Sequence, residues 1–355
     1  MDISIIIINY HSVTFTRACL KSIYENNDAL RLEVIVIDNA SYDGCGDMVR
    51  AEFPQVIFIQ SARNLGFAGA NNLGIQASHG THLLFLNPDT EIQGKAIESL
   101  FRSLASMPGA GMAGALLLNS DLSVQTTSIT AYPTIINQVL GTEYLRQRFP
   151  DAALWGIKPL FENRRTPVAV DAISGACMMA KREAIEQVRG FTADYFMYAE
   201  DLDLCLKVKK AGWKVYYVPD AVIVHHGGRS SDSRPESNYA GIMIRESMYH
   251  FMQVHRGRLY AWSFRAATAL VAVCRLFLLT VLLPASMFSA RGHAVIPIWR
   301  KWAGILAWCA GTRIWAHRER SMPSAFSPPV SASEGRPLQN SVLDSACQLT
   351  SDLKE

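Results

Sequence analysis

The stretch that decides the fold is ISIIIINYH, residues 3–11, which opens with five isoleucines around a single serine. β-branched residues favour an extended backbone, and a nearly continuous apolar run is typical of a strand buried on both faces of a parallel sheet. Polar residues follow the run directly. Residues 3–8 therefore predict a central parallel strand that ends in polar side chains.

The rest of the first third of the chain repeats this pattern. Short apolar runs predict further strands at 34–37, 56–59 and 83–86, and apolar residues at helical spacing predict helices between them at 14–24, 48–53 and 67–77. Strands that alternate with helices indicate βαβ units, an α/β fold and a parallel sheet.

Beyond residue 110 the alternation becomes irregular. We expect later strands at 115–118, 168–173, 215–218 and 222–224, and a helix at 201–210 with acidic residues at its start and lysines at its end. Residues 120–166 have no clear periodicity and are interpreted as a loop-rich insertion.

Charge divides the chain into two unlike parts. Residues 1–255 hold 22 basic and 26 acidic residues, whereas residues 256–320 hold 10 basic residues and 1 acidic residue. The basic part contains the apolar stretch 266–285, which is about long enough to cross a bilayer. Basic charge beside such a stretch favours an anionic membrane surface as partner and argues against nucleic acid.

The way in which this stretch meets the membrane has competing interpretations. Arg275 interrupts it, and both flanks are basic, which opposes a single span. An interfacial helix, or a hairpin that uses residues 294–312, keeps both flanks on one side. A buried core helix is the alternative without a membrane, and it leaves the excess positive charge unexplained.

These features predict three segments: a domain at 1–235, a membrane-associated helical segment at 236–320 and a disordered tail at 321–355, which is rich in serine and proline. The seven cysteines form no CxxC pair, which fits a reducing compartment. The N-terminus has no basic region before its apolar run, so we expect no signal peptide.

Four predicted strands end in polar residues, and parallel strands bring their carboxyl ends to one edge of the sheet, where ligands bind. Asp89 could hold a divalent cation against a diphosphate, or belong to a plain Asn-Pro-Asp turn. Asp38 could accept a hydrogen bond from a base, or cap a turn. Arg63 could pair with a phosphate, or be an ordinary surface arginine.

Two later positions also suggest chemistry. Glu200 and Asp201 begin the helix at 201–210, where a helix N-terminus stabilises an ionised carboxylate that could take a proton from a hydroxyl nucleophile. The alternative is a pair of ordinary capping acids. His225 follows a strand and could complete a metal site as a neutral imidazole, or be structural.

Several common nucleotide and hydrolase motifs are absent from the sequence. It contains no GxGxxG, no GxxxxGK[ST] and no GxSxG. These absences argue against a dinucleotide-dependent dehydrogenase, a P-loop NTPase and an α/β-hydrolase.

The motifs, in their order, resemble the inverting family 2 glycosyltransferases of the GT-A fold, most closely bacterial rhamnosyltransferases that build O-antigen and cell-wall glycans. The matching segments cover about residues 1–230 and include VIDNASYDG (36–44), RNLGFAGANN (63–72), LFLNPD (84–89), SGACMM (174–179), FMYAEDLDLCL (196–206), AGW (211–213) and VHHGGRS (224–230).

The resemblance implies a role for each matched residue. It places Asn9, Tyr10, Asp38 and Arg63 around the nucleotide, Asn64 near the sugar diphosphate, and Asn87 where the family's DxD-type motif has its first aspartate. It assigns Mg²⁺ or Mn²⁺ to Asp89 and His225, with His226 as the fallback. It makes Asp201 the general base with Glu200 in support, and it places Ser174, Gly175, Ala176 and Trp213 on the acceptor side.

The implied reaction is transfer of a sugar, L-rhamnose from dTDP-L-rhamnose, to a polyprenyl-diphosphate-linked glycan at the cytoplasmic face of a bacterial inner membrane. The donor could instead be UDP-GlcNAc, UDP-galactose or GDP-mannose, and a noncatalytic membrane-associated scaffold is an alternative from another class. A sugar-1-phosphate nucleotidyltransferase would need a Gly-rich basic loop after the first strand, and Asn9-Tyr10-His11 is not one.

Overall fold

The computed structural model describes residues 1–26, 30–162, 165–227, 239–286 and 295–311. Contacts group Met1–Met322 into one unit and Pro323–Glu355 into another, and every described residue belongs to the first. The predicted tail at 321–355 lies outside the described residues.

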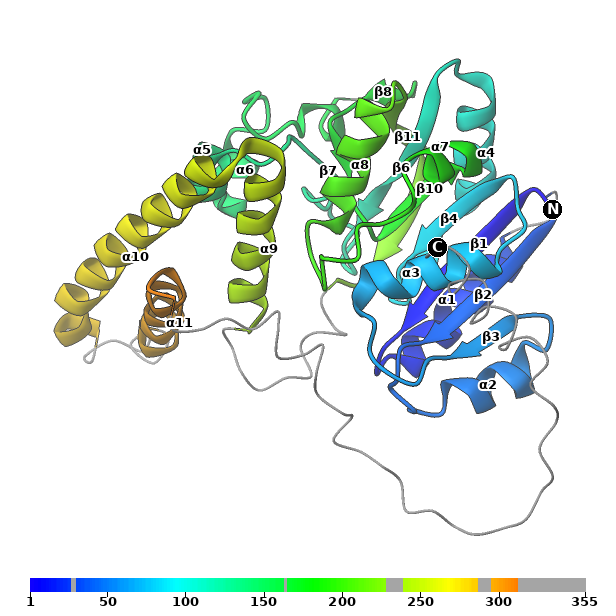
Figure 1. Cartoon of the computed structure of the whole chain (residues 1–355), viewed down its shortest axis with the longest axis horizontal. Helices are drawn as coiled ribbons and strands as arrows, with labels where there is room; N and C mark the ends of the chain where they lie inside the picture. Colours follow the sequence, from blue (N-terminus) through cyan, green and yellow to red (C-terminus); the bar gives the residue numbers. More distant parts are fainter. Residues whose placement is uncertain (27–29, 163–164, 228–238, 287–294, 312–355) are drawn as a thin grey trace, which may run out of the picture. The chain divides into compact units, whose positions relative to one another are not determined.

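A mixed sheet forms the centre of the described part of the chain (Figure 1). Its strand order is β3-β2-β1-β4-β10-β6-β11-β5, and β8 pairs with β11. The strands are β1 (Ile3–Asn9), β2 (Leu32–Asp38), β3 (Ile57–Gln60), β4 (His82–Leu86), β5 (Thr90–Ile92), β6 (Ala110–Leu118), β8 (Val168–Ala169), β10 (Cys177–Lys181) and β11 (Lys214–His225). Strands β7 (Ile129–Thr130) and β9 (Ala172–Ile173) form a separate pair.

Helices cover both faces of the large sheet, and the isoleucines of β1 alternate between the two hydrophobic cores that result. Ile5 and Ile7 pack with α1 (Val13–Glu25), α2 (Cys45–Glu52) and α4 (Ala96–Ser106), whereas Ile6 and Ile8 pack with α3 (Gly66–Ala77), α7 (Arg182–Gln187) and α8 (Glu200–Lys210). This two-sided burial explains why the sequence of β1 is apolar without interruption.

The α/β prediction is confirmed, and strands β1 to β4 pair in parallel as their alternation with helices predicted, whereas the later strands make the sheet mixed. Strand β10 is antiparallel to both β4 and β6, and β5 is antiparallel to β11. The predicted strands at 215–218 and 222–224 are one strand, β11, whose register shifts between Val218 and Val222 around Pro219. The predicted strand at 168–173 is divided between β8 and β9.

The insertion at 120–166 holds more regular structure than its sequence suggested. It contains β7, α5 (Ile135–Leu140), α6 (Glu143–Arg148) and a 3₁₀ turn, η1 (Lys158–Leu160). The hydroxyl of Thr134 accepts the backbone N–H of Asn137 to cap α5, and the hydroxyl of Thr142 caps α6 in the same way. These caps are the local signals for two helices too short to show periodicity.

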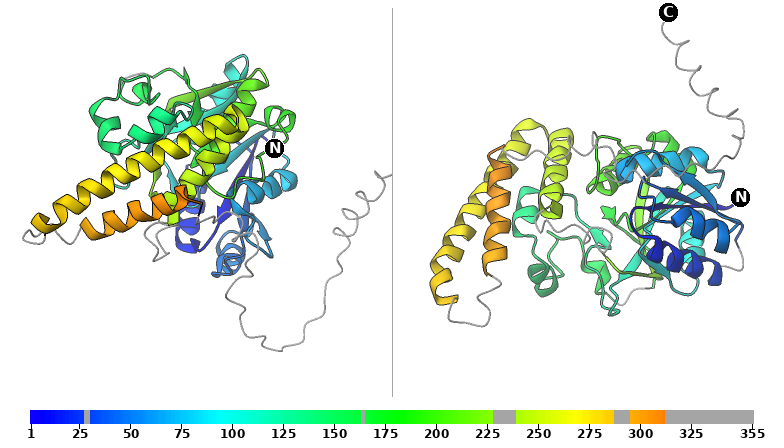
Figure 2. Two further views of the ribbon diagram at one scale, coloured as in Figure 1. Left: turned by 60° about the vertical axis from the view of Figure 1, so that its left-hand side comes forward. Right: turned by 90° about the horizontal axis from the view of Figure 1, so that it is seen from below.

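Three helices follow β11: α9 (Tyr239–Arg256), α10 (Arg258–Ser286) and α11 (Val295–Cys309). Gly257 has φ +89° at the turn between α9 and α10, a conformation that L side chains rarely adopt. Helices α10 and α11 lie side by side (Figure 2). Arg265 of α10 donates to the carbonyls of Trp308 and Cys309 at the end of α11, at 2.7 and 2.9 Å.

The arginine that interrupts the apolar stretch faces its neighbour helix. The guanidinium of Arg275 lies 4.4 Å from the centre of the Trp302 ring of α11, a cation–π contact. By length and composition, one helix in the described residues, Arg258–Val281, is long and apolar enough to cross a membrane.

Candidate active site

A row of polar side chains crosses the carboxyl ends of β1, β2 and β3. The parallel register aligns Asn9 with Asp38 and Asp38 with Gln60. The Asp38 carboxylate accepts hydrogen bonds from the side-chain amides of Asn9, at 2.8 Å, and Gln60, at 2.7 Å. Both Asn9 and Asp38 are buried. Their side chains therefore position one another, and they do not line the cavity described next.

A cavity of about 570 Å³ lies at this edge of the sheet and extends to the start of α8. Ten residues singled out from the sequence line it: Tyr10, Asn64, Asn87, Asp89, Ser174, Gly175, Ala176, Glu200, Asp201 and His225. The convergence expected from the strand ends therefore holds for most of the set.

Two more of the predicted residues do not line the cavity. Arg63 is exposed and does not line the cavity. Trp213 precedes β11 and donates to Gln187 at 2.7 Å, whereas His225 ends the same strand. At about 3.3 Å per residue, the strand separates the two by roughly 30 Å or more. Trp213 thus lies toward the opposite edge of the sheet, and its placement on the acceptor side is not supported by the structure.

The turn before α3 is built from two asparagines. Asn39 donates to the side-chain oxygen of Asn64 at 2.9 Å and accepts the backbone N–H of Leu65 at 2.8 Å. At Gly66, φ is +69° and a Cβ would clash with the carbonyl oxygen of Phe196. The glycine thus permits α3 to begin directly against the loop that precedes α8.

Asp89 and His225 lie next to each other in the lining of the cavity. His225 Nε2 lies 3.3 Å from Asp89 Oδ1, and Asp89 is almost wholly buried. Gln125 Nε2 donates to the backbone carbonyl of His225 at 2.7 Å, so its Oε1, 3.0 Å from His225 Nδ1, is an acceptor. Nδ1 therefore carries a proton, and in the neutral imidazole Nε2 would present its lone pair toward Asp89.

This geometry fits a divalent cation. Two acceptors at 3.3 Å repel one another unless a proton or a cation lies between them. A carboxylate and an imidazole, with Asn87 beside them, would leave positions for water and diphosphate oxygens. Within the described residues no group of three or more His, Cys, Asp and Glu side chains gathers, so substrate oxygens would have to complete the shell.

Asp201 faces the cavity from the first turn of α8. Its carboxylate accepts the backbone N–H groups of Gly175, at 3.0 Å, and Leu202, at 2.8 Å. Burial raises the pKa of Asp201, and the two amides act against that rise. The carboxylate is thus oriented by backbone on two sides and is more basic than an exposed aspartate.

Glu200, beside it, is only 6% exposed, and its Oε2 has no hydrogen-bond partner among the described residues. Burial, and secondarily the charge of Asp201, raise the pKa of Glu200 well above its usual value. Glu200 therefore keeps its proton to a higher pH than an exposed glutamate does, and neighbouring carboxyls with displaced pKa values are common at catalytic sites.

The loop before α8 is strained and clamped. Tyr198 and Ala199 both have positive φ, 68° and 63°, which costs a non-glycine residue about 1 kcal/mol or more. The carbonyl of Phe196 accepts the N–H of Phe67 at 3.0 Å, and that of Met197 accepts the Ser247 hydroxyl at 2.7 Å. Helices α3 and α9 thus hold the approach to Asp201.

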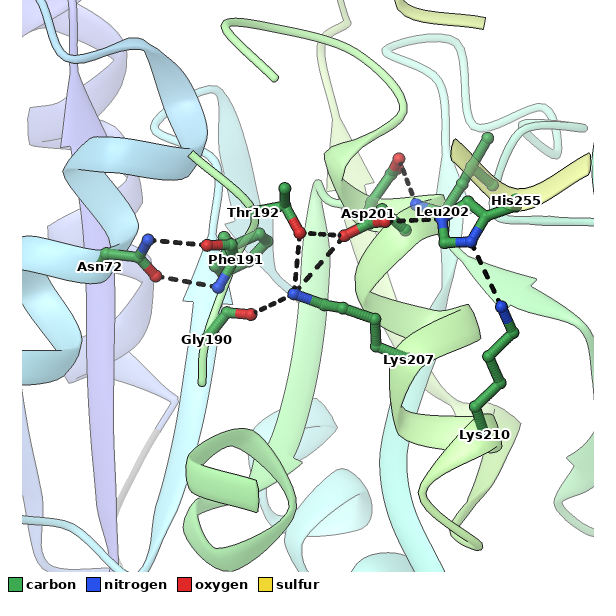
Figure 3. A network of polar contacts seen from close by, with 10 residues as sticks. Asn72, Gly190, Phe191, Thr192, Asp201, Leu202, Lys207, Lys210 and His255 are labelled. Atoms are coloured by element: carbon green, nitrogen blue, oxygen red, sulfur yellow. Dashed lines mark hydrogen bonds and ion pairs between the residues drawn. The ribbon is translucent and has the colours of Figure 1, made fainter. Parts of the chain in front are cut away.

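A second link joins α8 to α9 (Figure 3). Asp203 accepts from His255 at 2.7 Å and from the Thr192 hydroxyl at 2.6 Å, and Lys207 lies 3.5 Å away. Burial works against the charged carboxylate, but these partners outweigh it and lower the pKa of Asp203. This buried carboxylate, which has partners on both oxygens, ties α8 to α9.

Sequence reasoning missed one side of the cavity. We call Asn87, Asp89, Ser174, Gly175, Ala176 and His225 the strand wall, and Gln138, Arg146, Ile244 and Met248 the helical wall. The helical wall comes from α5, α6 and α9, within the segments that we interpreted as an insertion and as a membrane-associated appendage. Gln125, which orients His225, also comes from the insertion.

Comparisons with known proteins agree with this arrangement. A family model described as glycosyl transferase family 2 matches residues 4–189, and one described as glycosyl transferase family group 2 matches residues 142–315. An N-acetylglucosaminyl-diphospho-decaprenol L-rhamnosyltransferase of Mycobacterium tuberculosis is 31% identical over 258 residues, which cover 67% of this chain and 81% of that protein.

Two further matches are more distant. The rhamnosyltransferase WbbL of Escherichia coli K12 is 25% identical over 179 residues, covering 47% of this chain and 63% of that protein. A solved mannosyltransferase from Pyrobaculum calidifontis, in complex with GDP-Man and Mn²⁺, has a TM-score of 0.52 at 18% identity and covers 87% of this chain and 85% of its own. This last similarity concerns the fold.

Proposed function

The chain belongs to glycosyl transferase family 2, and we propose that it transfers L-rhamnose from dTDP-L-rhamnose to a hydroxyl of a polyprenyl-diphosphate-linked glycan. The GT-A fold and the glycosyltransferase class predicted from its motifs are confirmed. The observation that carries the proposal is that Asp201 and the Asp89–His225 pair line one cavity.

In this proposal Asp201 is the general base. Its carboxylate, held by the amides of Gly175 and Leu202, takes the proton of the acceptor hydroxyl as that oxygen attacks the anomeric carbon. The raised pKa makes it a better proton acceptor than an exposed aspartate. A single in-line displacement then inverts the anomeric centre.

Glu200 has a different task. Because its pKa is raised well above the usual value, it stays protonated while Asp201 is ionised, so it can donate a hydrogen bond to the acceptor. Its unpartnered Oε2 is buried at the cavity wall and would be satisfied by a bound sugar.

Asp89 and His225, with Asn87 beside them, would hold Mg²⁺ or Mn²⁺. The bound ion would offset the negative charge that develops on the leaving nucleoside diphosphate. The solved mannosyltransferase relative in fold carries Mn²⁺ with its nucleotide sugar, which supports a divalent ion. Gln125 keeps the His225 lone pair pointed at the site.

The donor and acceptor are inferred from the relatives. The Mycobacterium tuberculosis protein is named for rhamnose transfer to a decaprenol-linked GlcNAc diphosphate, and the Escherichia coli protein for rhamnose transfer. Mass analysis of products tests the inference, with membranes that contain the protein and dTDP-rhamnose, UDP-GlcNAc, UDP-galactose or GDP-mannose. A rhamnosylated lipid is expected; transfer from another donor would reassign the sugar, and no turnover with any would favour a scaffold.

We further propose that α10 and α11 enter the cytoplasmic face of a bacterial inner membrane as a hairpin, with domain limits near residues 235 and 320. The exposed apolar side chains of α10 support this: Leu259, Trp262, Leu270, Val273, Phe277, Leu278 and Val281. Arg275 would be shielded from lipid by Trp302. Flotation with anionic vesicles, followed by an alkaline wash, tests insertion, and release by the wash would contradict it.

A further inference from the structure

The helical wall contributes one cation to the cavity. Arg146 of α6 lines it and is half-buried. Its guanidinium has no hydrogen bond or ion pair among the described residues. The nearby carboxylate of Glu143 is occupied by Thr126, at 2.7 Å, and Gln147, at 3.0 Å. Burial lowers the pKa of Arg146, because desolvation disfavours the charged guanidinium, and the charge of Glu143 acts against that fall.

Apolar side chains share the cavity with Arg146. Pro133, Ile244 and Met248 line the same cavity. The short helices α5 and α6 expose large apolar side chains: Ile136 at 60%, Leu140 at 47% and Tyr144 at 73%. The backbone N–H of Ile135 donates to the Tyr260 hydroxyl at 3.2 Å, which joins α5 to α10.

A cation in the cavity beside an exposed apolar surface fits a ligand with an anionic head and a hydrocarbon tail. In the proposed mechanism the donor diphosphate has its counter-charge in the divalent cation that Asp89 and His225 would hold. A second diphosphate, on the lipid-linked acceptor, would need a counter-charge of its own. A guanidinium matches phosphate oxygens in a bidentate way.

We propose that Arg146 binds the diphosphate of an isoprenoid-linked acceptor, and that Ile136, Leu140 and Tyr144 contact its first isoprene units. This deepens the proposed function and rests on it for the identity of the acceptor. Arg146 would then set how deeply the acceptor enters, which places the sugar hydroxyl rather than the phosphate at Asp201.

Binding tests this inference without turnover. The full chain in detergent micelles is titrated with farnesyl diphosphate and with farnesol, followed by tryptophan fluorescence. Arg146→Ala should weaken farnesyl diphosphate about 10- to 100-fold and leave farnesol unchanged. Arg148→Ala is the matched control, because Arg148 is exposed on the same helix, stacks on Phe149 at 5.2 Å and does not line the cavity.

Two further measurements separate the possible sources of phosphate. Arg146→Ala should raise KM for the lipid-linked acceptor and leave KM for the nucleotide sugar unchanged, and it should bind anionic phospholipid vesicles as the wild type does. Three outcomes would overturn the inference. Arg146→Ala and Arg148→Ala could bind farnesyl diphosphate equally well, or Arg146→Ala could raise only the KM for the nucleotide sugar. Arg146→Ala could also weaken binding to anionic vesicles as much as it weakens binding to farnesyl diphosphate. Arg146-dependent binding without any sugar transfer would instead refute the proposed function alone.

Discussion

The two walls of the cavity are built by different means. The strand wall takes its positions from backbone register, because neighbouring strands end at one edge and bring Asn87, Asp89 and His225 together. The helical wall comes from short helices and from α9, which are far apart in the sequence and share no register. The strand wall therefore suits the proposed nucleotide diphosphate, and the helical wall suits the proposed lipid-linked acceptor.

The largest expected loss of activity comes from substituting Asp201, the proposed base for the acceptor hydroxyl. Asp201→Asn keeps the shape and removes the base, so transfer should fall by about 100- to 10,000-fold while nucleotide sugar still binds. Turnover and donor binding are measured together. Asp151→Asn is the control, since its side chain is 80% exposed. Near-normal turnover by Asp201→Asn would rule out the base.

The next effect concerns the strand wall alone. Gln125→Leu removes the acceptor that fixes the His225 tautomer, and the Mn²⁺ concentration needed for half-maximal activity should rise about 10- to 100-fold. His225→Ala should raise it further. His226→Ala serves as control, because His226 bonds Glu91 at 2.9 Å and does not line the cavity. A metal requirement altered by His226→Ala and not by His225→Ala would reverse the assignment.

A smaller effect is a slope in stability against pH. The folded-state pKa of Glu200 is raised above the usual 4.5. The stabilisation of the folded state by protonated Glu200 is therefore fully present below pH 4.5 and is lost as the pH rises through the raised pKa. Glu200→Gln cannot ionise, so its Tm should fall less than that of the wild type between about pH 5 and pH 8.

The control for this slope is Glu52→Gln, which removes an exposed carboxylate paired with Arg17 at 2.9 Å. That variant should keep the wild-type slope. Parallel slopes for Glu200→Gln and the wild type would show that Glu200 is not held neutral by the fold.

The smallest effect tests the far edge of the sheet. Trp213→Phe removes the bond to Gln187 and should cost about 1 kcal/mol of stability or less, with KM for the acceptor unchanged. A raised acceptor KM, measured beside chemical denaturation, would return Trp213 to the acceptor side.

Prediction from sequence succeeded where local pattern and tertiary structure coincide. The isoleucines of β1 predicted its burial, and the polar residues after the fourth predicted strand gave Asn87 and Asp89 of the strand wall. Ser174, Gly175 and Ala176 came from the family resemblance. Strand β10 was missed because CMMAK has no β-branched residue, and its antiparallel place is set by its neighbours. Pro219 divided β11 in the prediction, whereas the sheet accommodates it at a register shift.

The helical wall could not be predicted for a related reason. Helices α5 and α6 have six residues each, too few for a periodic pattern, and only their threonine caps indicate them. Arg146 and Gln125 have no motif around them. Their roles follow from what lies opposite them in space, which spacing along the chain does not record.

The contacts between α9 and α8, and between α9 and the loop before α8, have a practical consequence. Ser247 holds the loop that presents Asp201, His255 holds Asp203, and Ile244 with Met248 closes the cavity. A chain shortened at residue 235 to obtain a protein that needs no detergent would lose all of these contacts at once. Such trimming would remove part of the lining of the candidate active-site cavity, so we expect the shortened chain to lose turnover.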